Sequence, residues 1–171
     1  MAGGANGQAG STRTGARSLT AGLTAGLAGT AAMTIAQALE MRVTGRAASD
    51  VPGRVASRVS GYRPRRRRDR ERLSTGMHWG HGIVSGAVRG GLGLTPLRGG
   101  RANASHFALL WGSDVTLYRA LDVAPWPWRW SASELATDVL HKGVYVVVTG
   151  AVFERLAPAS SPSRDEGGHA A

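Results

Sequence analysis

Apolar and small residues are concentrated in four stretches of this chain, and most charged residues lie between them. The first stretch, 18–41, has no charge from Ser18 to Leu39, which is long enough for a helix to cross a hydrocarbon core of about 30 Å. Three further stretches follow at about 73–94, 104–121 and 131–156, with shorter apolar runs. This pattern predicts an all-α fold, a four-helix transmembrane bundle in one membrane domain, 18–156.

Glycine recurs every fourth residue in two of these stretches. Gly22 and Gly26 lie in the first, and Gly82, Gly86 and Gly90 lie in the second. Glycine is unfavourable inside a soluble helix, but in a membrane it lets two helix backbones approach closely. We therefore expect GxxxG packing between helices, and the same faces offer a route to a homo-oligomer.

The segments outside the four stretches differ in composition. Residues 1–17 and 157–171 contain few large apolar side chains, so we expect a disordered tail at each end. Residues 42–72 form an Arg-rich loop. Inside it, Ser49-Asp50-Val51-Pro52 is typical of a helix start, and valines follow at 55 and 59, which predicts a short helix lying on the membrane surface.

The net charge of +10 is concentrated in the Arg-rich loop, above all from Arg63 to Arg72. Such a run leaves open a soluble basic helical nucleic-acid-binding protein, but no known binding motif accompanies it. Beside a membrane span the run favours anionic lipid headgroups, at about 1 kcal/mol per arginine. The chain has no cysteine, which excludes disulfides and thiolate chemistry.

The arginines also predict an orientation. Because positively charged loops stay in the cytoplasm, the Arg-rich loop should be cytoplasmic and both termini should lie on the opposite side. The turn Pro125-Trp126-Pro127-Trp128-Arg129-Trp130 joins the last two stretches. Tryptophan favours the headgroup level, so this turn is predicted to lie at the membrane interface.

Titratable side chains inside the stretches are the candidate functional residues, because such groups are costly in a membrane. Odd-numbered helices end, and even-numbered helices begin, on the side of the Arg-rich loop. This connectivity predicts that seven of these residues gather in one half of the membrane: Glu40, His78, His81, Asp114, Glu134, Asp138 and His141. His106 alone is expected in the other half.

The seven residues suit more than one role. Their nitrogen and oxygen atoms could bind a divalent metal ion such as Zn, Fe or Mn, or they could relay protons, since histidine titrates near neutral pH. They could instead pair across helices in a non-catalytic membrane scaffold or assembly factor. The sequence contains no Walker loop, nucleophile elbow, His-Glu-x-x-His or dinucleotide motif, so it predicts no enzymatic reaction.

Three short motifs resemble a known group of proteins. They are Gly29-Thr30-x-x-Met33, His78-Trp79-Gly80, and a run from Leu121-Asp122 through Pro125 and Ser131 to Glu134, Asp138 and His141. Together they resemble small uncharacterised bacterial inner-membrane proteins, the YagU-like group, although the long Arg-rich loop departs from that pattern. The resemblance implies a multi-pass protein of the bacterial inner (cytoplasmic) membrane and no known activity.

Overall fold

The computed structural model describes the backbone of residues 4–157 and the side chains from Thr12 onward. Every regular element in this range is helical, which confirms the all-α prediction. The elements in chain order are α1 (Gly4–Thr44), α2 (Val51–Ser60), α3 (Arg67–Leu92), α4 (Gly99–Ala120), the 3₁₀ turn η1 (Pro127–Arg129) and α5 (Ala132–Leu156). Four helices are thus long, and α2 is the short helix that the sequence predicted within the Arg-rich loop.

Two helices begin earlier than predicted. Helix α1 starts at Gly4, so it includes residues 4–17, for which the sequence predicted a disordered tail. Helix α3 starts at Arg67 inside the charged run, where Arg67 Nε lies 2.7 Å from Glu71 Oε1 one turn later. Both extensions add residues to an existing helix, which costs far less than starting a new one. The expected C-terminal tail lies outside the described residues, except for Ala157.

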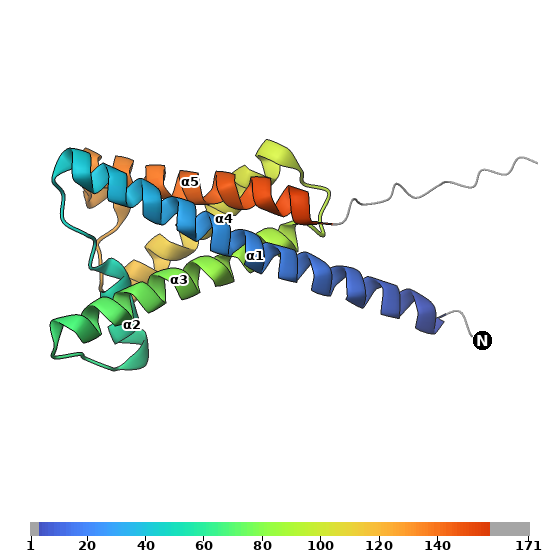
Figure 1. The fold of residues 1–171 in the computed structure, drawn as a ribbon, viewed down its shortest axis with the longest axis horizontal. Coiled ribbons are helices and arrows are strands. Elements are labelled where there is room, and N and C mark those ends of the chain that lie inside the picture. The colour runs from blue at the N-terminus through green and yellow to red at the C-terminus, as the bar shows by residue number, and fades with distance from the viewer. Residues whose placement is uncertain (1–3, 158–171) are drawn as a thin grey trace, which may run out of the picture.

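Helix α1 lies between α3 and α5, and its N-terminal part extends past the ends of the other helices (Figure 1). Gly22 and Gly26 of α1 contact α3 without intervening side chains. A Cβ atom added at Gly26 would lie 2.7 Å from Gly82 O and 2.8 Å from Gly86 Cα, and one added at Gly22 would lie 2.8 Å from Gly90 N. These glycine faces pack within one chain, so a second copy would have to bind elsewhere.

The distribution of side chains in α1 is the reverse of that in a soluble amphipathic helix. Large apolar residues face outward, among them Leu19, Leu23 and Leu27, while small residues such as Ala25 and Thr30 are fully buried. The other long helices repeat this arrangement. Their exposed apolar residues include Val84 and Val88 in α3, Leu109 in α4, and Val139, Leu140 and Val147 in α5.

Two segments of the described chain are long and apolar enough to cross a membrane by length and composition. They are Thr12–Thr44 in α1 and Ala132–Leu156 in α5. Helix α3 opens on the charged residues 67–72, and α4 contains Arg101, Asp114 and Arg119. The expected membrane helices 73–94 and 104–121 are therefore present as helices, but their sequences alone do not mark them as spans.

The turn before α5 is fixed by local hydrogen bonds. Trp126 and Trp128 stack with ring centroids 5.1 Å apart, and Trp130 Nε1 donates to Pro125 O. Ser131 then caps α5: its side chain accepts from the Glu134 backbone amide, and the Glu134 carboxylate accepts from the Ser131 backbone. This capping box satisfies backbone donors at the start of α5 and sets where the helix begins.

Candidate functional site

A cavity of about 540 Å³ opens at the end of the molecule where α1 ends and α3 begins. All five α-helices line this cavity, and so does the turn 125–130, which we call the Trp-rich turn. Six of the seven predicted site residues line it: His78, His81, Asp114, Glu134, Asp138 and His141. Glu40 lies beside it through contacts with Arg46 and His141, which do line the cavity. The structure therefore brings the predicted residues to one end of the helices.

Asp114 is the centre of the polar cluster on the cavity wall. Its side chain is 3% exposed, with Oδ1 3.0 Å from His81 Nε2 and Oδ2 3.3 Å from Lys142 Nζ. Lys142 Nζ also lies 2.7 Å from Asp138 Oδ1, and Trp111 Nε1 donates to Asp138 Oδ2 at 2.9 Å. We call Asp114, Asp138, Lys142 and His81 the Asp114 cluster. With neutral histidine, two aspartates and one lysine leave it a net charge of −1.

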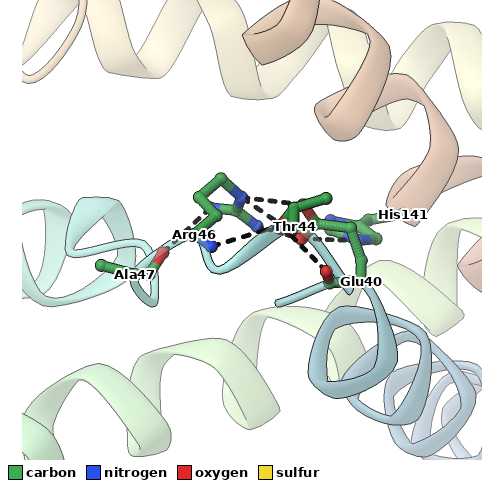
Figure 2. A network of polar contacts seen from close by, with 5 residues as sticks. All are labelled: Glu40, Thr44, Arg46, Ala47 and His141. Atoms are coloured by element: carbon green, nitrogen blue, oxygen red, sulfur yellow. Dashed lines mark hydrogen bonds and ion pairs between the residues drawn. The ribbon is translucent and has the colours of Figure 1, made fainter. Parts of the chain in front are cut away.

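A second ion pair borders the cavity at the end of α1 (Figure 2). Arg46 Nη2 lies 2.7 Å from Glu40 Oε2, and Arg46 Nε lies 3.2 Å from both carboxylate oxygens. Gly45 permits this contact because its φ of 70° turns the chain back at the helix end. The hydrogen bonds from Arg46 satisfy Glu40, and Glu40 raises the pKa of the Arg46 guanidinium. This pair is thus neutral as a unit.

His141 connects the two groups. It belongs to α5, its side chain is 6% exposed, and its Nε2 lies 4.0 Å from Glu40 Oε2 without a hydrogen bond to any described residue. Nearby, His78 Nε2 lies 2.9 Å from Thr34 Oγ1. Imidazole nitrogens therefore face the cavity both beside the Glu40 pair and beside Asp114.

Glu134 has a different role from the one predicted for it. Its carboxylate accepts hydrogen bonds from the backbone and hydroxyl of Ser131, and the residue is exposed at the cavity rim. A Ser followed three residues later by Glu is a capping-box signature. That signal was present in the sequence and explains Glu134 without any part in the cluster.

Lys142, Trp111 and Arg46 were not predicted as site residues. The prediction considered groups that ligate metals or titrate near neutral pH, and this choice omitted the cation between Asp114 and Asp138. A usable signal existed, because Lys142 follows Asp138 by four residues, the spacing at which helical side chains pair. No group of three or more His, Asp or Glu side chains between residues 12 and 157 is arranged to hold a metal ion.

A separate polar group lies toward the other end of the helices. His106 is fully buried with Nε2 3.1 Å from Ser85 O, and Arg89 is 1% exposed with Nη2 3.0 Å from Glu154 Oε1. The Arg89 guanidinium also lies 4.5 Å from the centre of the Phe153 ring. His106 is thus apart from the Asp114 cluster, and Arg89 is a buried cation that the sequence analysis did not single out.

Comparison with known proteins adds no assignment. No family model matches this chain, and neither a curated protein nor a solved structure shows significant similarity to it. The resemblance to the YagU-like group therefore stays a prediction. The functional proposal below depends on the geometry of this molecule.

Proposed function

We propose that this chain is an integral membrane protein in which α1, α3, α4 and α5 cross the bilayer and the Asp114 cluster takes up and releases protons. The proton relay is one of the two chemical roles that the sequence left open. The observation that carries it is the geometry of Asp114, a buried carboxylate between His81 and Lys142.

The membrane location is supported by which side chains are buried and which are exposed. Soluble proteins bury large apolar residues and expose charged ones. Here Arg89, His106, Asp114, His141 and Lys142 are buried, and leucines and valines face outward from every long helix. In lipid this arrangement is favourable, because the hydrocarbon tails solvate the outer apolar face and the polar groups pair inside.

The orientation follows from the charged end of the molecule. Arg63 to Arg72 form the loop and the first turns of α3, close to the end where the cavity opens. Positive loops favour the cytoplasmic side and anionic headgroups. Accordingly, we place the cavity on the cytoplasmic side of a bacterial inner membrane, with the Trp-rich turn at the same interface.

The charge balance of the Asp114 cluster supports proton binding. Its net charge of −1 is costly in a low-dielectric environment, and one proton on His81 would make the cluster neutral. The imidazole Nε2 lies 3.0 Å from Asp114 Oδ1 and makes no hydrogen bond to a described residue, so a proton there would form an ion pair with that carboxylate. Since His81 lines the cavity, the proton can exchange with water on that side.

A proton-flux assay tests this role. We expect proteoliposomes containing the full chain to acidify under an imposed potential faster than protein-free liposomes, with the internal pH followed by a trapped dye. Asp114→Asn removes the carboxylate that stabilises a proton on His81 and should lower the flux at least about tenfold, which corresponds to an activation free energy higher by about 1.4 kcal/mol.

Glu71→Gln is the matched control, because it also neutralises one carboxylate but in an exposed pair on the surface of α3. Its flux should equal that of the unaltered chain. Equal flux for Asp114→Asn and the unaltered chain, with correct insertion of both, would contradict the proposal. So would a flux no greater than that of protein-free liposomes.

A further inference from the structure

The cavity beside the Asp114 cluster is much larger than proton transfer requires. A relay of side chains and a few waters needs no continuous space, whereas about 540 Å³ lies in the range of small-molecule sites. Its walls come from helices that are distant in sequence, since Met33 of α1, Val55 of α2 and Leu110 of α4 all line it. The space is therefore built by the fold and is not confined to one loop.

The walls of the cavity suit an apolar molecule. Its lining includes the side chains of Met33, Val55, Met77, Leu110, Leu117, Val123, Trp130 and Tyr145. The deep wall in contrast carries Asp114 and Lys142, whose side chains are 3% and 9% exposed. A ligand that fits both parts has an apolar or aromatic body and one polar or charged centre.

The charges around the cavity indicate the sign of that centre. Arg46 is neutralised by Glu40, and Arg54 lies 4.0 Å from Asp50. At the exposed rim Arg129 and Glu134 have opposite charges. The charge around the cavity that has no partner of opposite sign is the net −1 of the Asp114 cluster. A bound cation makes the deep wall neutral, whereas a bound anion doubles its negative charge.

His141 adds an independent observation that the cavity takes a ligand. Its Nε2 lacks a hydrogen bond to any described residue although the side chain is 6% exposed and lines the cavity. Buried polar atoms are usually hydrogen-bonded, so an atom that faces a cavity without a protein partner can bind a ligand there. Among the described residues, His81 Nε2 is a second such atom on the cavity wall. Neutral imidazole accepts a hydrogen bond at such an atom, which an N–H group of a cationic ligand can donate.

We propose that this cavity binds a small apolar organic cation and releases a proton when it does so, an inference that rests on the proposed proton uptake by the Asp114 cluster. The cation and the proton compensate the same negative charge, so binding of either weakens binding of the other. The proton leaves His81 for water as the cation enters. Because such coupling is reciprocal, a proton bound to the cluster weakens cation binding by the same factor as the cation weakens proton binding.

Two ions of equal shape and opposite charge test the inference. Tetraphenylphosphonium and tetraphenylborate are offered to the detergent-purified full chain by equilibrium dialysis, with protein-free micelles as background. The phosphonium centre cannot donate a hydrogen bond and the two ions share one shape, so this pair isolates the effect of charge. We expect saturable binding of the phosphonium at pH 8, at least about tenfold weaker binding at pH 5.5, and weaker binding of the borate than of the phosphonium at pH 8.

The pH dependence follows from the groups that face Asp114. Helix α3 contributes His81, α5 contributes Lys142 and Asp138, and α4 itself contributes Tyr118. Uptake of one proton by the Asp114 cluster cancels the charge that holds the cation, and imidazole is the side-chain type whose charge changes between about pH 5 and 8. Adding the phosphonium to unbuffered protein at pH 7 should also release protons into solution.

Asp114→Asn should abolish the preference for the phosphonium, and Glu71→Gln should keep it. If Asp114→Asn fails to fold, the pH comparison on the unaltered chain decides alone. Equal binding of both ions, or phosphonium binding no greater than that of micelles, would overturn this inference. If proton flux persists although the phosphonium does not bind selectively, the proposed function stands and only the cation site is lost. Phosphonium binding that does not change with pH would contradict the exchange of cation for proton.

Discussion

Gly86→Leu is expected to prevent stable packing of α1 against α3. A Cβ atom at position 86 would lie 2.7 Å from Gly26 Cα and 2.9 Å from Gly26 N, so any side chain meets backbone that cannot move aside. Extra methylene groups in a well-packed core typically cost about 1–3 kcal/mol, and contact with rigid backbone places this variant at about 3 kcal/mol or more. Thermal unfolding in detergent, followed by circular dichroism, measures the loss.

Gly80→Leu is the matched control in the same helix. Position 80 is exposed, and an added Cβ has no neighbouring atom within 4 Å, so this variant should unfold near the temperature of the unaltered chain. Leucine also has the higher helix propensity, which removes intrinsic propensity as an explanation for a loss at 86. Similar unfolding temperatures for the two variants would show that α1 and α3 do not pack through these glycines.

Lys142→Met is expected to be the most damaging change in the polar cluster. The lysine is the cation nearest to both Asp114 and Asp138, at 3.3 Å and 2.7 Å. Removing one member of a buried ion pair leaves an uncompensated charge and typically costs about 3–5 kcal/mol. Unfolding by increasing SDS in mixed micelles measures the effect on the free energy of unfolding.

A double variant separates lost charge compensation from lost packing. Asp114→Asn combined with Lys142→Met removes one negative and one positive charge, so the two changes should together cost less than the sum of the single variants. Arg67→Met is the control, because it breaks a pair with Glu71 that has the same i, i+4 spacing and 2.7 Å distance as Lys142 and Asp138 but lies on an exposed surface, where pairs contribute little. Strict additivity at 114 and 142 would contradict the pairing.

Much of the architecture could be predicted because helices obey local rules. The uncharged run Ser18 to Leu39 required one long helix, and glycine every fourth residue in two segments indicated where two backbones meet. Connectivity alone then placed His78, Asp114 and Asp138 at the same end of the molecule, since it depends only on the number of helices. The extra helical turns before Ser18 and Leu73 were missed because helix extension needs no apolar residues.

The details of the site could not be predicted because they depend on tertiary contacts. Nothing local places Lys142 between aspartates from two helices, or folds Arg46 back onto Glu40 beyond the turn at Gly45. The cavity itself exists because α2 and the Trp-rich turn close its sides. Glu134 is the reverse case, since its capping signature was readable in the sequence and only a role in the site was predicted for it.

The location of this chain in a membrane is the premise on which the proton and cation proposals depend. Membranes from cells that produce the full chain are washed with alkaline sodium carbonate, which releases peripheral proteins, and are then sedimented. We predict that the protein stays in the membrane pellet and is released only by detergent, because the outward leucines and valines of the long helices contact lipid. Recovery of the folded protein in the carbonate supernatant would contradict the account.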